Sequence, residues 1–243
     1  MATLAVGRGS RERLFYTGIA IAMFAAVFLG FARSFFLRPW FPDVPAPTET
    51  IFYVHGAVFT AWLVLLVVQP ALVAVRRTDL HRKLGWLGAG LAVAMVALGI
   101  VGALVAARRP TGFVGIPIPP LQFLIVPFFD MVLFATFVAL AIARRRDTQS
   151  HKRWMLLASV NLLAAGIARW PFAMMAGGPP VYFGLEDLFI VALVAWDFAS
   201  RGRVHPVTLW GGLAIVVSQP LRLVLSGTAA WLAFAGWAVG LLG

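Results

Sequence analysis

The chain of 243 residues is 61% hydrophobic and 12% charged, and its formal net charge at pH 7 is +11. This composition leaves too little polar surface to coat a soluble globule, so it predicts an integral membrane protein with a single transmembrane domain over residues 1–243. The Lys and Arg residues gather in short segments between apolar runs, which is a topology signal and argues against nucleic acid as a partner. The absence of cysteine excludes disulfides, iron–sulfur clusters and cysteine nucleophiles.

Seven apolar segments, nearly free of charge, are long enough to cross hydrocarbon about 30 Å thick and predict an all-α bundle of seven transmembrane helices in a lipid bilayer. The first segment follows Arg8, Arg11 and Arg13. We interpret it as a retained signal anchor, because it is longer than the apolar core of a cleaved secretory signal. The predicted spans are residues 14–32, 51–75, 84–107, 121–143, 154–176, 183–200 and 207–225.

Basic residues fall mainly in alternate loops, which orients the predicted bundle. An N-terminus in the cytoplasm puts most of them on the inner side and leaves Arg33, Arg38, Arg108 and Arg109 outside. By the positive-inside rule the chain is therefore N-in and C-out. The last apolar stretch, residues 228–242, is short for a crossing and carries two tryptophans, so we expect a short helix lying along the outer interface.

Polar side chains inside the predicted spans are costly in hydrocarbon and usually face the bundle interior. In the second span His55, Trp62 and Gln69 are seven residues apart, so they form one stripe along the helix. This stripe indicates either a polar seam that lines a ligand path or an interior interface in which the polar groups bond to neighbouring helices.

The later spans add further ionisable residues. Asp130 lies about halfway along the fourth span, where a carboxylate must be protonated, paired or hydrated, and Pro127 is expected to kink the helix beside it. Arg169, in the fifth span, is a candidate counter-ion for an acid. Glu186 and Asp197 are close to three helical turns apart and face the same way. This network indicates either a ligand or proton site or a structural clamp. The candidate ligand-binding residues are His55, Trp62, Gln69, Asp130, Asn161, Arg169, Glu186 and Arg222.

Three histidines stand at the inner start of outgoing helices, hence at similar depth. Imidazoles on facing helices at one level are what a haem b or a His/Asp metal site requires. The alternative is that they are interfacial histidines touching lipid head groups. No two histidines occupy the interiors of adjacent spans, which counts against a haem held within the hydrocarbon. The residues of this cofactor or metal hypothesis are His81, His151, His205 and Asp79.

No motif such as HExxH, GxSxG, GxxxxGK[ST] or DDxxD occurs, so the sequence does not indicate metalloprotease, acyl-transfer, nucleotide-binding or prenyl-transferase chemistry. The leading hypothesis is a non-enzymatic membrane protein whose polar interior binds or passes a small ligand or protons. One rival is a redox or metal protein with a histidine-ligated group. The other is a structural subunit that associates with copies of itself or with a larger membrane complex.

Four segments carry a family resemblance, and they read HGAVFTAWLVLLVVQPALVA, DLHRKLGWLG, HKRWMLLAS and SQPLRLVLSGTAAWLAF. They resemble a bacterial family of polytopic inner-membrane proteins whose activity is not established, and the likeness covers most of the chain from about His55 onward. The resemblance implies a location in the bacterial inner membrane and a multi-pass helical fold. It implies no activity.

Overall fold

The computed structural model of the chain describes residues 2–44, 47, 49–113 and 116–242, with side chains from residue 9 onward. All regular secondary structure in these residues is helical, as the sequence predicted. The helices end where apolar runs give way to charged, proline or glycine residues.

Helix α1 (Ala2–Phe31) begins well before the predicted span of residues 14–32. Its extra turns include Arg8, Arg11, Glu12 and Arg13, and both residue types are good helix formers. The chain continues through one π-helical turn, η1 (Ala32–Phe36), and one 3-10 turn, η2 (Arg38–Trp40).

Helices α2 (Thr50–Ala74) and α3 (Thr78–Arg108) pack as an antiparallel hairpin. α2 ends in a Schellman motif, in which the amide of Arg77 donates to the carbonyl of Leu72 (2.8 Å). Arg76 takes the left-handed position of this motif, with φ of 63°. Glycine is the usual residue there, because a Cβ in the left-handed region costs about 1–2 kcal/mol.

A one-residue break separates α4 (Pro120–Phe123) from α5 (Ile125–Ala143). Pro127 has no amide hydrogen to bond to the carbonyl of Phe123, and its ring crowds that carbonyl. The break at Leu124 is therefore the local distortion that the proline predicted.

Helix α6 (Thr148–Val160) begins at Asp147, whose carboxylate accepts from the amides of Gln149 (3.0 Å) and Ser150 (3.2 Å). The Ser150 hydroxyl also donates to this carboxylate, and these bonds hold the pKa of Asp147 below its ordinary value. The sequence Asp–Thr–Gln–Ser thus specifies where the helix starts.

The predicted span of residues 154–176 is interrupted after α6. The amide of Leu162 bonds to the carbonyl of Ser159 (3.2 Å), three residues back, instead of continuing the α-helical pattern. A short helix, α7 (Leu163–Ile167), follows, and then a 3-10 turn, η3 (Ala173–Gly177).

Two long helices and a short one complete the chain. α8 (Pro179–Arg201) starts with two prolines, which suit a first helical turn, and it ends at Gly202, whose φ of 70° closes the helix. α9 (Pro206–Leu225) and the short helix α10 (Ala229–Gly240) follow.

Five helical stretches of the described chain are long and apolar enough to cross a membrane, and each matches one of the predicted spans. The other two predicted spans are not among these long apolar stretches. One is interrupted between α6 and α7, and α8 carries three acidic residues. The five stretches are Gly9–Phe36, Thr50–Ala74, Thr78–Arg108, Pro120–Ala143 and Pro206–Leu225.

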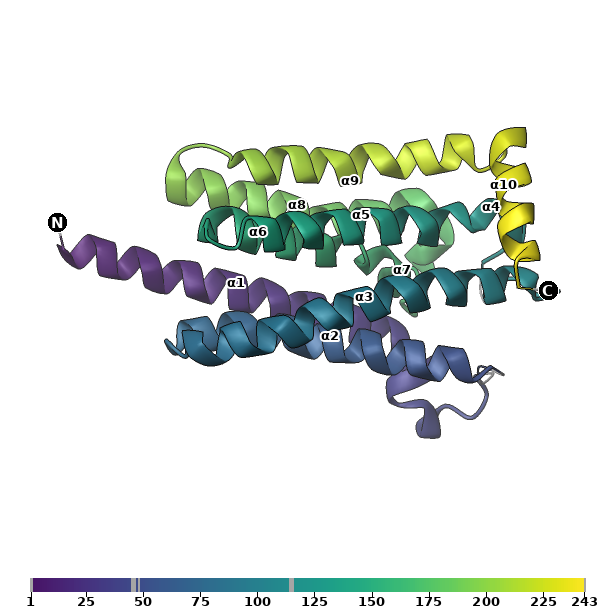
Figure 1. The fold of residues 1–243 in the computed structure, drawn as a ribbon, viewed down its shortest axis with the longest axis horizontal. Coiled ribbons are helices and arrows are strands. Elements are labelled where there is room, and N and C mark those ends of the chain that lie inside the picture. Colours follow the sequence, from purple (N-terminus) through teal and green to yellow (C-terminus); the bar gives the residue numbers. More distant parts are fainter. Residues whose placement is uncertain (1, 45–46, 48, 114–115, 243) are drawn as a thin grey trace.

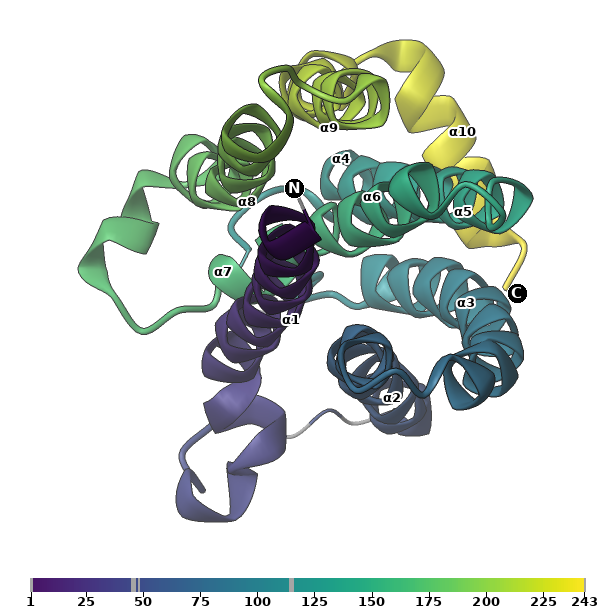
Figure 2. The ribbon, with the colours of Figure 1, turned by 90° about the vertical axis from the view of Figure 1, so that its left-hand side faces the viewer.

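The long helices run roughly along one axis (Figure 1). The loops that join α2 to α3, α5 to α6 and α8 to α9 lie at the same end as the start of α1, as the charge pattern predicted. We call this the basic end, after the arginines of those loops. Viewed from it, α5 and α6 lie between the α2–α3 pair and the α8–α9 pair (Figure 2). α10 crosses the opposite end.

One apolar core joins the helices. Its centre includes Met23, Met95, Phe134, Leu157 and Leu193, which are all completely buried and come from five different helices. These shared side chains embed the polar sites described below in one large apolar cluster, and a second, smaller cluster packs α10 against α3 and α4.

Helices α1 and α7 approach most closely at two glycines. A side-chain carbon on Gly30 would overlap the backbone carbonyl of Gly166, and one on Gly166 would stand 3.0 Å from the Cα atom of Val27. Small residues let two backbones approach in this way, which favours tight helix packing in a membrane.

The substitution Gly30→Ala is expected to destabilise the fold by about 1–3 kcal/mol, because the added methyl group forces α1 and α7 apart. Gly18→Ala is the matched control on the same helix, since nothing lies within 4 Å of a side-chain carbon there. It is expected to be neutral or to stabilise by up to about 1 kcal/mol. Thermal unfolding in detergent compares the two variants, and equal melting temperatures would contradict the close crossing.

Candidate functional site

Helices α5, α6 and α9 bring three buried polar residues together inside the bundle. Arg222 pairs with the carboxylate of Asp130, and its other terminal nitrogen donates to Asn161 Oδ1 (3.3 Å) and to Ser218 Oγ (3.0 Å). The amide of Asn161 in turn donates to the backbone carbonyl of Asp130 (2.9 Å). Asn161 lies at the break after α6, so the interruption of that helix coincides with the polar site.

Glu186 of α8 completes this group. Its side chain is 2% exposed, and it senses the charges of Asp130 and Arg222 and hydrogen-bonds to the backbone of Ala164. The bond to Ala164 uses the start of α7, where amides have no partner within the helix. We call Asp130, Asn161, Glu186 and Arg222 the interior cluster.

The interior cluster holds more acid than base. Its two carboxyl groups face one guanidinium group, and a third carboxyl, Asp187, lies beside Glu186 on α8. Asp187 is half-buried and accepts a hydrogen bond from Gln219 (2.9 Å). Among the described residues, Arg222 Nε is buried without a hydrogen-bond partner. An arrangement with this charge balance favours a bound proton or cation over a bound anion.

A second buried ion pair lies nearer the basic end, between Arg153 of α6 and Asp197 of α8, whose side chains are both completely buried. Asp197 also accepts from the Thr208 hydroxyl (2.6 Å) and from the backbone amide of His205 (3.0 Å). Arg153 also donates to the side-chain oxygen of Gln149 (2.7 Å). This pair therefore ties together α6, α8 and the start of α9.

Sequence reasoning placed Arg153 among the loop charges that set topology and missed its burial. The signal was its position three, four and seven residues before Leu156, Leu157 and Val160, which makes it part of one helix face. All three of those residues are buried. The expectation that Glu186 and Asp197 face the same way on α8 agrees with the structure, because both are buried.

His205 caps α9 in its neutral form. Its Nδ1 atom accepts a hydrogen bond from the amide of Val207 (3.1 Å), so Nδ1 carries no hydrogen. Burial, followed by the nearby guanidinium groups of Arg153 and Arg201, lowers the pKa of His205. The folded protein therefore binds fewer protons than the unfolded chain at pH values around and below the ordinary value of about 6.5.

Stability is consequently expected to fall as the pH is lowered through about 6.5, because protonation of His205 is easier in the unfolded chain. His205→Asn is the control, since Asn is also a good N-cap and does not titrate. Melting temperatures measured from about pH 8 to about pH 5 should decrease more for the wild type than for this variant. If the melting temperatures of the wild type and His205→Asn fall equally with pH, His205 is not the group responsible.

The stripe predicted on α2 does not form one seam. His55 stacks on Phe59, with ring centroids 3.9 Å apart. Trp62 donates to the hydroxyl of Ser159 (3.2 Å), toward α6. Gln69 faces the start of α3. Seven-residue spacing placed these side chains on one helix face, but α2 packs against different neighbours along its length, so each has a different environment.

Arg169 has contacts away from the interior cluster. Its guanidinium group donates to the carbonyl of Ala165 and lies 5.0 Å from the ring centroid of Phe31. The counter-ion of Asp130 is Arg222, and not Arg169. The register between α9 and α5 does not follow from the sequence, so the pairing of Arg222 with Asp130 was not predicted.

His81 and His151 do come together at the basic end, with ring centroids 6.4 Å apart. His151 Nδ1 lies 2.9 Å from the carbonyl of Ala141, so this nitrogen carries the hydrogen. The side-chain amide of Gln69 makes hydrogen bonds in one of its two orientations. In that orientation its nitrogen donates to His81 Nδ1 (2.6 Å) and its oxygen accepts from the backbone amide of Gly85 (3.2 Å). Neutral His81 then carries its hydrogen on Nε2, so only His151 presents a free lone pair.

The other two residues of the metal hypothesis lie elsewhere. Asp79 is exposed and pairs with Arg77 (3.4 Å), and His205 caps α9. In the part of the chain that the structure describes, no group of three or more His, Asp or Glu side chains is arranged to hold a metal ion. The four-residue metal site is thus reduced to a histidine pair.

No protein-family model, curated protein or solved structure matches this chain. The functional assignment therefore rests on the geometry of the interior cluster and of the two sites nearer the basic end.

Proposed function

We propose that this chain is a bacterial inner-membrane protein with seven spans, N-in and C-out, that binds and passes protons at the interior cluster. Five long apolar helices support the membrane location. The fifth and sixth spans of this topology are α6–α7 and α8, which are joined by the buried Arg153–Asp197 ion pair. The arginine-rich loops at one end of the bundle favour the orientation.

The observation that carries the proposal is that two buried carboxyl groups share one guanidinium group. An uncompensated charge in such an environment costs several kcal/mol. Asp130 has Arg222 as its partner, so Glu186 is the group left without a cation of its own. A proton on Glu186 balances the cluster without requiring a cavity, and its exchange is the elementary step of proton transfer.

The cluster communicates with one end of the bundle more directly than with the other. Glu186 and the half-buried Asp187 both lie in the half of α8 that is remote from the basic end, which favours proton exchange with that side. Toward the basic end, Leu157, Leu193 and Ile215 are completely buried and separate the cluster from the Arg153–Asp197 pair. Passage across this apolar layer requires movement, and the break between α6 and α7 is where a helix bends most readily.

Infrared difference spectroscopy of the purified protein in lipid, between about pH 8 and about pH 5, tests proton binding. The wild type should show the carbonyl band of a buried carboxylic acid, and Glu186→Gln should lose it. Asp79→Asn, which removes an exposed carboxylate, should keep it. A band that persists in Glu186→Gln would exclude the assignment.

Proton passage is measured separately in liposomes with an imposed membrane potential and an internal pH dye. Glu186→Gln is expected to slow acidification at least tenfold relative to the wild type and Asp79→Asn. If the variant changes the melting temperature while its flux equals that of the wild type, the cluster is a structural clamp and the proposed function is wrong.

The histidine pair supports a second candidate function, a redox or metal protein. Its favouring observation is the 6.4 Å separation of the rings of His81 and His151 on facing helices. Binding between them requires the Gln69 amide to turn so that His81 frees its Nε2 atom. A visible spectrum and an elemental analysis of protein purified without chelator test this candidate. It predicts a haem band or bound metal that His151→Ala abolishes, and a colourless, metal-free sample would contradict it.

A further inference from the structure

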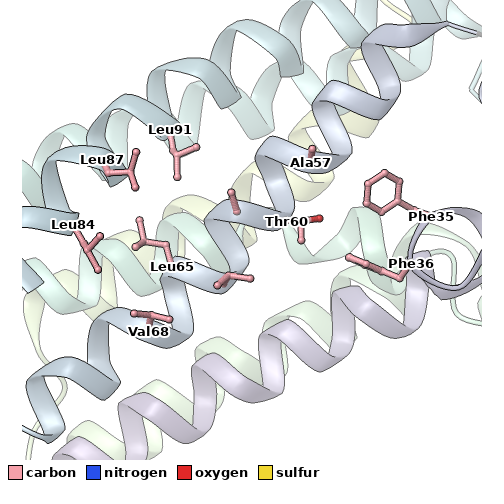
Figure 3. Close-up of a pocket in the computed structure, with 11 residues that line it drawn as sticks. Phe35, Phe36, Ala57, Thr60, Leu65, Val68, Leu84, Leu87 and Leu91 are labelled. Carbon is pink, nitrogen blue, oxygen red and sulfur yellow. The ribbon is translucent and has the colours of Figure 1, made fainter.

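An apolar groove of about 670 Å³ runs along α2, and its lining includes no residue of the interior cluster (Figure 3). Its floor is one face of α2 from Ala57 to Val68. Leu84, Leu87 and Leu91 of α3 point toward that face, and η1 closes the far end with two phenylalanines. The hydroxyl of Thr60, the one polar side-chain group of the lining, donates to the carbonyl of Gly56 (2.6 Å), so its hydrogen is already used.

The groove has the length of a fatty acyl chain. Ala57 and Val68 are eleven residues apart on α2, which corresponds to about 17 Å at the rise of an α-helix. One leaflet of hydrocarbon is about 15 Å thick. The small side chains of Ala57 and Ala61 leave room beside the helix, and an apolar groove in a membrane-spanning hairpin takes its occupant from the lipid.

Val68 and Leu84 line the end of the groove nearest the basic end, and exposed cations lie close to this end in the chain. Arg82 and Lys83 directly precede Leu84, and Arg76 and Arg77 follow the end of α2. These residues are all exposed. Between residues 70 and 107 the sequence has a single acid, Asp79, which pairs with Arg77. The mouth of the groove therefore has an excess of positive charge that an acyl chain alone does not explain.

Arg76 adds a second observation. It stands at the left-handed position of the Schellman motif, with φ of 63°, where glycine would be more stable. Strained backbone positions are frequent at functional sites, and this one places a guanidinium group at the turn between the two helices that form the groove.

We propose that the groove and its basic mouth form a binding site for an anionic glycerophospholipid. One acyl chain lies along α2 between the leucines of α3 and η1, and the phosphate contacts Arg82, Lys83 and Arg76. A positive mouth selects an anionic head group over a zwitterionic one, because each basic side chain near an anionic head group contributes favourable electrostatic energy. The site shares no residue with the interior cluster and does not depend on the function proposed for it.

Native mass spectrometry in mild detergent tests the site by titrating the full-length protein with phosphatidylglycerol or phosphatidylcholine. The wild type is expected to bind phosphatidylglycerol more tightly. The double variant Arg82→Ala/Lys83→Ala should bind it about tenfold more weakly or worse, and should lose the preference over phosphatidylcholine. Ala61→Trp, which fills the groove from an exposed position, should weaken the binding of both lipids.

Two controls match these variants. Arg145→Ala/Arg146→Ala removes the same charge from the basic end on the α5–α6 loop, and Val93→Trp adds the same side chain at an exposed position on α3 outside the groove. Both should bind like the wild type. Equal losses in the control and the groove variants would show a general electrostatic or surface effect and would overturn the proposal, as would unchanged binding in Ala61→Trp. Arg76→Gly separates lipid binding from stability. It should raise the melting temperature, because glycine suits the left-handed backbone, and it should weaken phosphatidylglycerol binding, because a cation is lost.

Discussion

Replacing Arg222 with Leu is expected to lower the free energy of unfolding by about 3–5 kcal/mol, because it leaves a buried carboxylate without its cation. Arg222 is 2% exposed and is the partner of Asp130, and it also bonds to Asn161 and Ser218. The loss therefore combines an unpaired charge with unsatisfied polar groups on three helices. Thermal or denaturant unfolding in detergent micelles measures it.

A second variant separates the charge effect from a general packing defect. In Arg222→Leu/Asp130→Asn the buried carboxylate is neutralised, so most of the lost stability should return. If the double variant is as unstable as Arg222→Leu, lost packing around the arginine outweighs the charge. The role assigned to the Asp130 pair would then be wrong.

Asp197→Ala is expected to have an effect of the same size, about 3–5 kcal/mol, at the other ion pair. Both side chains of this pair are completely buried, and the substitution also removes the acceptor for Thr208 and for the amide of His205. Asp197→Asn keeps the shape and part of the hydrogen bonding, so it should fall between the wild type and Asp197→Ala in melting temperature.

Asp187→Ala, on the same helix, is the control for this prediction. Asp187 is half-buried and has one side-chain bond, to Gln219, so its loss should cost about 1 kcal/mol or less. If the melting curves of Asp187→Ala and Asp197→Ala coincide, the stabilising role assigned to the buried Arg153–Asp197 pair is wrong. The Arg153–Asp197 pair and the interior cluster share no residue. Thr208, which donates to Asp197, lies about 21 Å from Arg222 along α9. The stability losses of Asp197→Ala and Arg222→Leu should therefore be additive.

The sequence alone predicted the features that depend on residues close together in the chain. The apolar runs located α2, α3, α5 and α9 to within a few residues, except that α3 starts six residues before its predicted span. The burial of Glu186 and Asp197 followed from helical spacing, and the approach of His81 to His151 from their equal depth. These features need only the period of a helix and the thickness of a bilayer.

Features that depend on how helices pack did not follow from the sequence. Arg169 was the candidate counter-ion for a buried acid, whereas the packing of α9 against α5 pairs Asp130 with Arg222. The break after α6 has no proline or glycine at its position, so no local residue indicates it. Arg153 looked like a loop charge because its partner, Asp197, is 44 residues away.

In the proposed topology of seven spans, the Arg153–Asp197 pair would also set an order in which the chain enters the bilayer. Neither α6 nor α8 is among the five stretches that are long and apolar enough to cross a membrane, and an unpaired Arg or Asp on a membrane helix makes insertion more costly. During synthesis α6 leaves the ribosome first and has no partner for Arg153. We therefore expect α6 to enter the lipid only after α8 has emerged, so that the two helices enter as a neutral pair. A nascent chain halted before α8 should keep α6 accessible to water.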